Sequence, residues 1–212
     1  MANRFRRRGE LSVRHKIGAG IFFLVLLWSA IHPKDYLTWL METLPAMIAF
    51  VVLSVTRKRF PLTDLLYGLI LIHCIILMIG GHYTYAEVPF FDWLKEIGVF
   101  ERNNYDKVGH FAQGFVPAMI TREIIIRHDI LTRKGWLNFF VISVCLAISA
   151  FYELIEWWVA LLIGQNAEAF LGTQGYIWDT QSDMAYALFG ATVAIVILSG
   201  SHDLAIERLR KH

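Results

Sequence analysis

The sequence predicts an all-α polytopic membrane protein with about six transmembrane helices in one bundle. Of its 212 residues, 56% are hydrophobic and only 18% are charged, which is too apolar for an ordinary globular surface. Six apolar stretches follow one another, each long enough, or nearly so, to cross hydrocarbon as a helix. The stretches are continuously apolar rather than alternating, which argues against a transmembrane barrel.

The six spans account for most of the chain. The first follows the basic segment 4–8, and no small-residue cleavage site comes after it, so we interpret it as an uncleaved span rather than a secretory signal. The fourth and sixth stretches are weaker, because charged residues lie near one end of each. Spans of roughly 20 residues leave only short connections, which predicts a single integral membrane domain over 1–212. The predicted spans are 15–31, 36–55, 62–80, 105–127, 136–163 and 180–199.

Charge and cysteine usage exclude two other classes of protein. The net charge is only +2, and the basic residues occur in short separated clusters, so no nucleic-acid partner is expected. Cys74 and Cys145 each lie inside an apolar run, which predicts two small buried hydrophobes rather than a disulfide framework. Membrane lipids are the expected surroundings.

The Lys and Arg residues of the loops predict the orientation in the membrane. With both termini in the cytoplasm, the opposite side holds only four of the 20 basic residues: Lys34, Lys95, Arg102 and Lys107. This asymmetry follows the positive-inside rule and predicts cytoplasmic N- and C-termini. The residues then assigned to the cytoplasmic side are Arg4, Arg6, Arg7, Arg8, Arg14, Lys16, Arg57, Lys58, Arg59, Arg122, Arg127, Arg133, Lys134, Arg208, Arg210 and Lys211.

Polar residues gather at the outer ends of three predicted spans. The fourth span carries an acid, an imidazole and an amide at i, i+4 and i+7, the fifth carries two carboxylates at i and i+3, and the sixth repeats the i, i+4, i+7 spacing. Such spacings put each set on one helix stripe, which should face protein rather than lipid. The candidate site residues are Asp106, Lys107, His110, Glu153, Glu156, Asp179 and Asp183, with Gln113, Ser149 and Tyr186 on the same stripes.

Carboxylates at bilayer depth cost about 2.5–3.5 kcal/mol each on insertion scales, so something must compensate them. One resolution is a divalent cation together with Lys107, which could activate water or clamp a phosphate. The other is protonation, which would let a Glu paired with His110 act in general acid/base chemistry or relay protons. No compact metal signature accompanies these residues, so the metal remains one of two alternatives.

Structural roles compete with the functional ones. Asp106 and Asp179 lie where helices start and could cap free backbone N–H groups. Lys107 could reach the outer surface, and His82 could be a loop residue. His73 is expected to be hydrogen-bonded between helices. Another pair, Arg122 and Glu123, is expected to extend toward the cytoplasmic surface.

Three segments together resemble a known family. Asp106 to Phe111, Glu153 to Trp158 and Asp179 to Met184, joined with the motif at 82–85, are similar to the YjdF-type family of bacterial inner-membrane proteins over nearly the whole chain. More distantly, residues 105–195 resemble the VanZ-like superfamily, which is associated with glycopeptide resistance. The resemblance implies a bacterial inner-membrane location and leaves the reaction unidentified.

Three functions from different classes fit these observations. In the leading hypothesis, an outward-facing polar cavity binds or modifies the headgroup of an envelope lipid or glycan, with His110 or Glu156 as general base. A small proton-coupled transporter is the second, disfavoured because the cytoplasmic halves of the spans are almost wholly apolar beyond Gln113 and Ser149. A non-enzymatic membrane partner whose buried charges set helix packing is the third.

Overall fold

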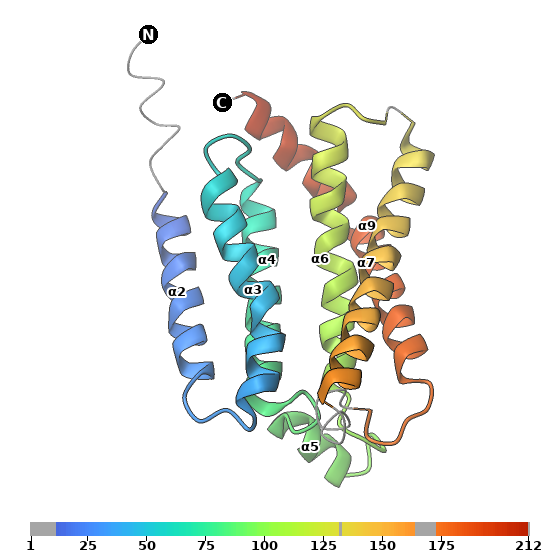
Figure 1. Cartoon of the computed structure of the whole chain (residues 1–212). Coiled ribbons are helices and arrows are strands. Elements are labelled where there is room, and N and C mark those ends of the chain that lie inside the picture. The colour runs from blue at the N-terminus through green and yellow to red at the C-terminus, as the bar shows by residue number, and fades with distance from the viewer. Residues whose placement is uncertain (1–11, 132, 164–172, 212) are drawn as a thin grey trace.

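A computed structural model shows a bundle of long helices with no strand among the residues that it describes, which are 12–131, 133–163 and 173–211. Six long helices run side by side, and one short helix lies across an end of the bundle (Figure 1). The basic segment 4–8 lies outside the described residues. The helices are α2 (Val13–Ser29), α3 (Tyr36–Thr56), α4 (Asp64–Tyr83), α5 (Pro89–Glu96), α6 (Tyr105–Arg127), α7 (Lys134–Ile163) and α9 (Asp179–Lys211).

The six predicted spans each correspond to one long helix, and the all-helical fold class is confirmed. Four helices, α3, α4, α7 and α9, are long and apolar enough to cross a membrane by length and composition. The count of six spans is therefore approximate. α2 has only 17 residues, and α6 carries charged residues at both of its ends. The short helix α5, which begins with a proline at its first turn, was not predicted.

The outer surface of the bundle is apolar. Large hydrophobic side chains with most of their surface exposed include Val55, Leu162 and Val196, on three different helices. Contiguous exposure of this kind would be unfavourable in water, whereas hydrocarbon solvates it. The surface therefore agrees with the membrane location that the composition predicts.

Helices α6 and α9 form the closest pair in the bundle. A Cβ atom added at Gly114 would lie 1.7 Å from the carbonyl oxygen of Ala187, and one added at Gly190 would lie 2.1 Å from that of Phe111. The two backbones therefore touch where glycine is required, as in other close membrane helix pairs. Around this pair, α4 and α7 pack on α6, α3 packs on α4, and α2 packs on α4.

Helix α9 is longer than its predicted span. Its 33 residues would measure about 50 Å, which exceeds the hydrocarbon thickness of about 30 Å. The last turns run obliquely across the end of the bundle (Figure 1). Within α9, Ser199 and Ser201 hydrogen-bond back to main-chain carbonyls of their own helix, a contact that often accompanies helix bending.

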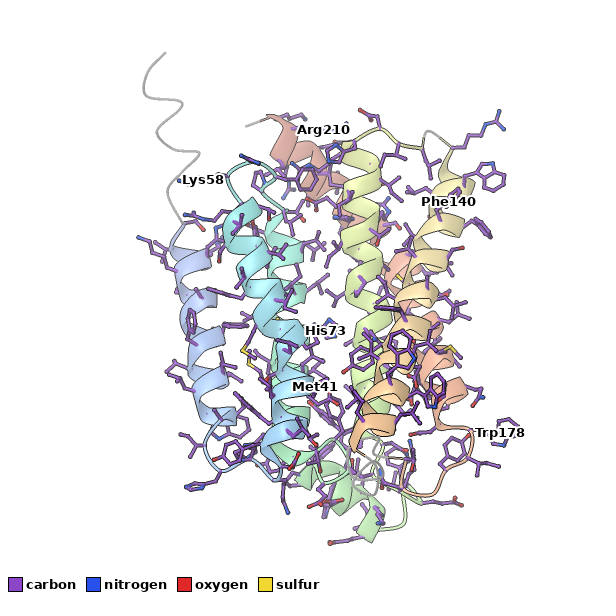
Figure 2. The ribbon with its side chains drawn as sticks, in the orientation of Figure 1. Met41, Lys58, His73, Phe140, Trp178 and Arg210 are labelled. Carbon is purple, nitrogen blue, oxygen red and sulfur yellow. The ribbon has the colours of Figure 1, made fainter. Side chains whose placement is uncertain are left out.

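The bundle has two chemically different ends. We call the end that carries α5 the α5 end, and the end where α2 begins and α9 finishes the terminal end. Lys58 and Arg210 lie at the terminal end, and Trp178 lies at the other (Figure 2). The start of α2 and the finish of α9 thus share one side, as the topology requires. That this side is cytoplasmic remains a prediction.

Candidate functional site

The first turns of α6 bring charged side chains into the interior at the α5 end. Lys107 is only 7% exposed, and its Nζ donates to Asp179 Oδ1 at 2.8 Å and to Asp183 Oδ1 at 2.6 Å. Asp106 Oδ2 lies 3.2 Å from the same nitrogen. The alternative in which Lys107 reaches the outer surface is wrong, because three carboxylates hold its ammonium group inside.

Arg102, in the connection before α6, completes this ionic group. One of its Nη atoms donates to both Asp106 and Asp179, the latter at 2.7 Å. The Tyr176 ring lies against both cations, with the Arg102 guanidinium carbon 5.1 Å and the Lys107 Nζ 5.9 Å from its centroid. Both cations are therefore fully engaged by the protein's own groups. The sequence grouped Arg102 with Lys107 on one predicted side of the membrane but gave no signal for its role.

Three candidate residues meet next to this group, one each from α6, α7 and α9. His110 Nε2 lies 3.6 Å from Asp183 Oδ1, and His110 Nδ1 lies 3.8 Å from Glu153 Oε1. Gln113, one turn further along α6, places its Oε1 2.9 Å from His110 Nδ1. The predicted stripe of Asp106, His110 and Gln113 is thus confirmed as a set of inward-facing side chains.

Not every polar atom here has a partner. Glu153 Oε1 and Ser149 Oγ on α7 are buried and have no hydrogen-bond partner among the described residues. Burying an unpartnered polar atom costs about 1–3 kcal/mol, so such atoms call for an explanation. Glu156 is half-buried on the same helix and is not among the residues whose ligand atoms gather around Asp183.

Two groups of residues are close enough to share a metal ion. One consists of His110, Glu153 and Asp183, and the other of Asp106, Asp179 and Asp183. In each group, one ligand atom from every residue lies within 4.8 Å of the others. The second group is already neutralised by Arg102 and Lys107, whereas the first contains the unpartnered oxygen.

The capping alternative holds in part for Asp106. Its Oδ1 accepts a hydrogen bond from the backbone N–H of Lys107 at 2.8 Å while Oδ2 meets the cations. The loop interpretation of His82 is wrong, because it lies in the last turn of α4, where its Nδ1 donates to the carbonyl oxygen of Ser29 at 3.0 Å. The expected interhelical bond of His73 is also absent, since its buried Nε2 has no partner in the described part of the chain.

One further acid belongs to the interior at the α5 end. Glu42 on α3 is buried, and its Oε2 accepts a hydrogen bond from the Tyr152 hydroxyl at 3.1 Å. Tyr85, just after the end of α4, lies in the same region. Its ring fits against Gly80 of α4 and Gly109 of α6, which have no side chain to displace it. Glu42 had a signal in the sequence, because it is the one acidic residue within the apolar stretch 36–55.

The terminal end holds a second buried ionic cluster, and the expectation that Arg122 and Glu123 extend to the surface is wrong. Glu123 is fully buried and accepts hydrogen bonds from Thr63 Oγ1 at 2.8 Å, from Arg127 at 2.9 Å and from His202 Nε2 at 2.9 Å. Arg122 in turn donates to His202 Nδ1 at 3.2 Å and to Asp203 at 2.7 Å. The sequence suggested that this half of the bundle is almost wholly apolar, and the buried cluster shows that this interpretation is wrong.

A cavity of about 620 Å³ lies elsewhere, between α2, α3 and α4. Its walls include Phe22, Leu71 and Cys74, and Arg14 and Arg57 belong to its lining as well. None of the candidate site residues lines it.

Comparisons with known proteins agree with the membrane assignment. The family model described as "Predicted membrane protein (DUF2238)" matches residues 15–204. The chain is 51% identical over 185 residues to "Inner membrane protein YjdF" of Escherichia coli (strain K12), covering 87% of this chain and 88% of the relative. No solved structure matches. The VanZ-like resemblance is not shown by these comparisons.

The match supports a multi-pass protein of the bacterial inner membrane, as predicted, and brings no biochemical activity with it. It covers α2, α3, α4, α5, α6 and α7 and most of α9, and so contains both buried clusters. The chain therefore belongs to the DUF2238 family of predicted membrane proteins, the YjdF-type family that its polar segments resemble.

Proposed function

We propose that the cluster at the α5 end binds the polar headgroup of an envelope lipid or glycan and acts on it. The observation that carries the proposal is an unsatisfied set of acceptors in a buried site. Glu153 Oε1 has no donor, and His110 faces carboxylate oxygens beyond hydrogen-bond distance. A hydroxyl-rich headgroup would supply donors for such oxygens, while its hydrophobic tail would stay in the lipid around the bundle.

The pairing of Arg102 and Lys107 limits the kind of headgroup that this site could bind. Lys107 and Arg102 each donate to two carboxylates, so neither is free to neutralise a phosphate. Free acceptors instead favour hydroxyl groups, and exposed aromatic rings at the same end, such as Trp178 and Tyr176, could pack against a sugar. This argument favours a glycan or another polyhydroxylated headgroup over a simple phosphate.

If the bound headgroup is modified, His110 is the residue best placed to act as general base. With Gln113 Oε1 accepting from Nδ1–H, the Nε2 lone pair is left to take a proton. Gln113 would then hold the ring in one tautomer, which is the positioning role that a second group plays in acid/base catalysis. Glu156 remains the alternative base, although it lies outside the group around Asp183.

Native mass spectrometry of purified protein tests the headgroup proposal. Wild type would be offered matched detergent-solubilised lipids that differ only in the headgroup: a zwitterionic phospholipid, an anionic phospholipid and a glycolipid. We expect glycolipid binding to exceed phospholipid binding, and to fall at least tenfold in Glu153→Gln and Asp183→Asn. Glu87→Gln is the control, since Glu87 is a half-exposed carboxylate at the same end. Equal binding of all three lipids, or binding unchanged by the variants, would contradict the proposal.

A second function, proton-coupled transport, is favoured by one observation. Buried polar groups occur in the α5-end cluster, at His73 partway along the bundle (Figure 2), and in the terminal cluster around His202. His73 Nε2 has no partner among the described residues, so it could pass a proton between the two clusters. Proton flux in proteoliposomes that is lost in His73→Leu but kept in His128→Leu, at an exposed position, would support transport; no flux in either case would remove it.

A further inference from the structure

We propose that His110, Glu153 and Asp183 bind a divalent metal ion at the α5 end. The proposal rests on the same cluster as the proposed function. With a metal ion on Nε2, His110 could not act as general base, and that role would pass to Glu156. Three separate helices supply one ligand each, and one ligand atom of every residue lies within 4.8 Å of the others. The site is therefore built by tertiary packing rather than by a local run of acidic residues.

The His110 ring leaves one nitrogen available to a cation. Gln113 Oε1 accepts from Nδ1, so a neutral ring presents a lone pair at Nε2. That nitrogen lies 3.6 Å from Asp183 Oδ1, which already accepts from Lys107 Nζ at 2.6 Å. No hydrogen bond to Nε2 occurs among the described residues, so a proton or a metal ion could bind there.

The unpartnered oxygen of Glu153 is the second, independent observation. Glu153 is 8% exposed, and its Oε1 has no hydrogen-bond partner among the described residues. The same atom lies 3.8 Å from a ring nitrogen of His110, which is too far for a hydrogen bond. Ligands held at about 2.1 Å from one tetrahedral ion lie about 3.4 Å apart. His110 Nε2 lies 3.6 Å from Asp183 Oδ1, whereas the 3.8 Å contact of Glu153 is to Nδ1, so the Glu153 carboxylate would have to move toward Nε2 to share an ion with it.

Acidic side chains outnumber cations around the site. The buried Glu153, Asp179 and Asp183 and the partly buried Asp106 meet two permanent cations, Arg102 and Lys107. The excess of negative charge favours binding of a cation, and a divalent ion would balance two ionised carboxylates.

The donor set selects among metals. One imidazole nitrogen with two carboxylates suits Zn²⁺ or Mn²⁺, whereas Ca²⁺ and Mg²⁺ favour ligand shells of oxygen alone. The ring also has the support that metal-binding histidines usually have, because its other nitrogen donates to Gln113. Three protein ligands leave a coordination position open for water or for a headgroup oxygen.

The test uses full-length protein in detergent, stripped with a chelator and then titrated with Zn²⁺ or Mn²⁺ alone. We expect about one equivalent to bind wild type, with at least tenfold weaker binding in His110→Ala, Glu153→Gln and Asp183→Asn. His82→Ala and Glu87→Gln are matched controls at the same end and should bind as wild type does. No uptake by folded wild type, or uptake that the three variants do not change, would overturn the metal site.

A measurement on wild type covers the case in which the variants do not fold. Mn²⁺-loaded wild type should show coupling to one coordinated histidine nitrogen by pulsed electron paramagnetic resonance. The same spectrum is then recorded for Gln113→Ala. Absence of the coupling in wild type would overturn the proposal. A weakened coupling in Gln113→Ala would support it, since Gln113 positions the ring.

The metal site and the proposed function can fail separately. Headgroup binding is measured in the metal-stripped protein, and metal uptake is measured without lipid. Metal uptake without headgroup selectivity would leave the metal site standing and contradict the proposed function. Headgroup selectivity without metal uptake would do the reverse.

Discussion

Helices α6 and α9 carry a buried ionic cluster at each end, and the two clusters differ in how completely their atoms are paired. At the terminal end, Glu123 accepts from Thr63, Arg127 and His202, and Arg122 binds His202 and Asp203. Two carboxylates there face two guanidinium groups, so the charges balance. Only Arg122 Nε lacks a hydrogen-bond partner among the described residues of that cluster.

The cluster at the α5 end is neither balanced nor complete. Carboxylates outnumber cations, Glu153 Oε1 has no donor, and the His110 ring lies beyond hydrogen-bond distance of two acidic oxygens. A buried ionic cluster that is fully paired can act as a structural clasp, whereas incomplete pairing costs stability that selection retains when the site binds something. The comparison favours a structural role for the terminal end and supports the ligand binding that we propose for the α5 end.

The largest expected effect comes from disturbing the contact that holds both clusters together. Gly114→Ala would put a Cβ 1.7 Å from the Ala187 carbonyl oxygen, so α6 and α9 would have to separate. We expect a loss of at least about 3 kcal/mol, the upper part of the range for overpacking. Gly200→Ala, where nothing lies within 4 Å of the added atom, should keep the wild-type melting temperature. Equal melting temperatures for both variants would refute this packing.

Removing Lys107 should have the next largest effect. Lys107→Met would leave three aspartates with Arg102 alone, and breaking a buried ion pair costs about 3–5 kcal/mol. The loss should be greater at pH 8 than at pH 5, because acid neutralises carboxylates that no longer have a cation. Thermal unfolding at the two pH values measures it, and a pH-independent loss would show that packing, not charge, is what the variant removes.

Removing one member of the terminal cluster should reduce stability somewhat less. His202→Ala removes the bridge between Glu123 and Arg122, but each keeps another charged partner. We expect about 1–3 kcal/mol of destabilisation, typical of a buried hydrogen-bond network that loses one member. Headgroup and metal binding at the α5 end should be unchanged in whatever fraction stays folded. His128→Ala, at an exposed histidine of the same end, is the control.

The smallest effect is expected outside both clusters. Lys34 lies 2.6 Å from Glu87, and the hydrogen bond to that carboxylate, with its charge, raises the pKa of Lys34 above the usual value. The contribution of this pair is present at neutral pH and would be lost only as the pH rises through the raised pKa. Because both groups are exposed, Lys34→Ala should leave the melting temperature at pH 7 unchanged. A marked loss would mean that exposed pairs matter here as much as the buried clusters.

Local patterns explain which parts of this account the sequence could supply. Continuous apolar runs predicted the six long helices, and the i, i+4, i+7 spacing predicted that Asp106, His110 and Gln113 face inward together. Both predictions depend only on helical periodicity, which any window of sequence contains. The helix α5 was missed because the prediction relied on apolar runs long enough to cross hydrocarbon, and α5 is an amphipathic helix of only eight residues.

Partnerships between distant residues had no such signal. His202 lies 79 residues from Glu123 along the chain, and it reaches that partner only because α9 continues past the predicted end of its span and runs obliquely. Arg102 likewise counted only as a loop charge until packing brought it to Asp179, 77 residues away. Charged residues at span ends were therefore interpreted as surface groups, although tertiary pairing buries them.

The most direct test of the difference between the two clusters is the melting temperature of Glu153→Gln beside that of Glu123→Gln, in metal-stripped protein under identical conditions. Glu153→Gln should melt at or above the wild-type temperature, because it removes an unpaired buried charge from an acidic cluster. Glu123→Gln should melt lower, by an amount that corresponds to about 1–3 kcal/mol, because it weakens three charge-assisted or buried hydrogen bonds. Equal destabilisation by the two variants would contradict the assignment of ligand binding to the α5 end.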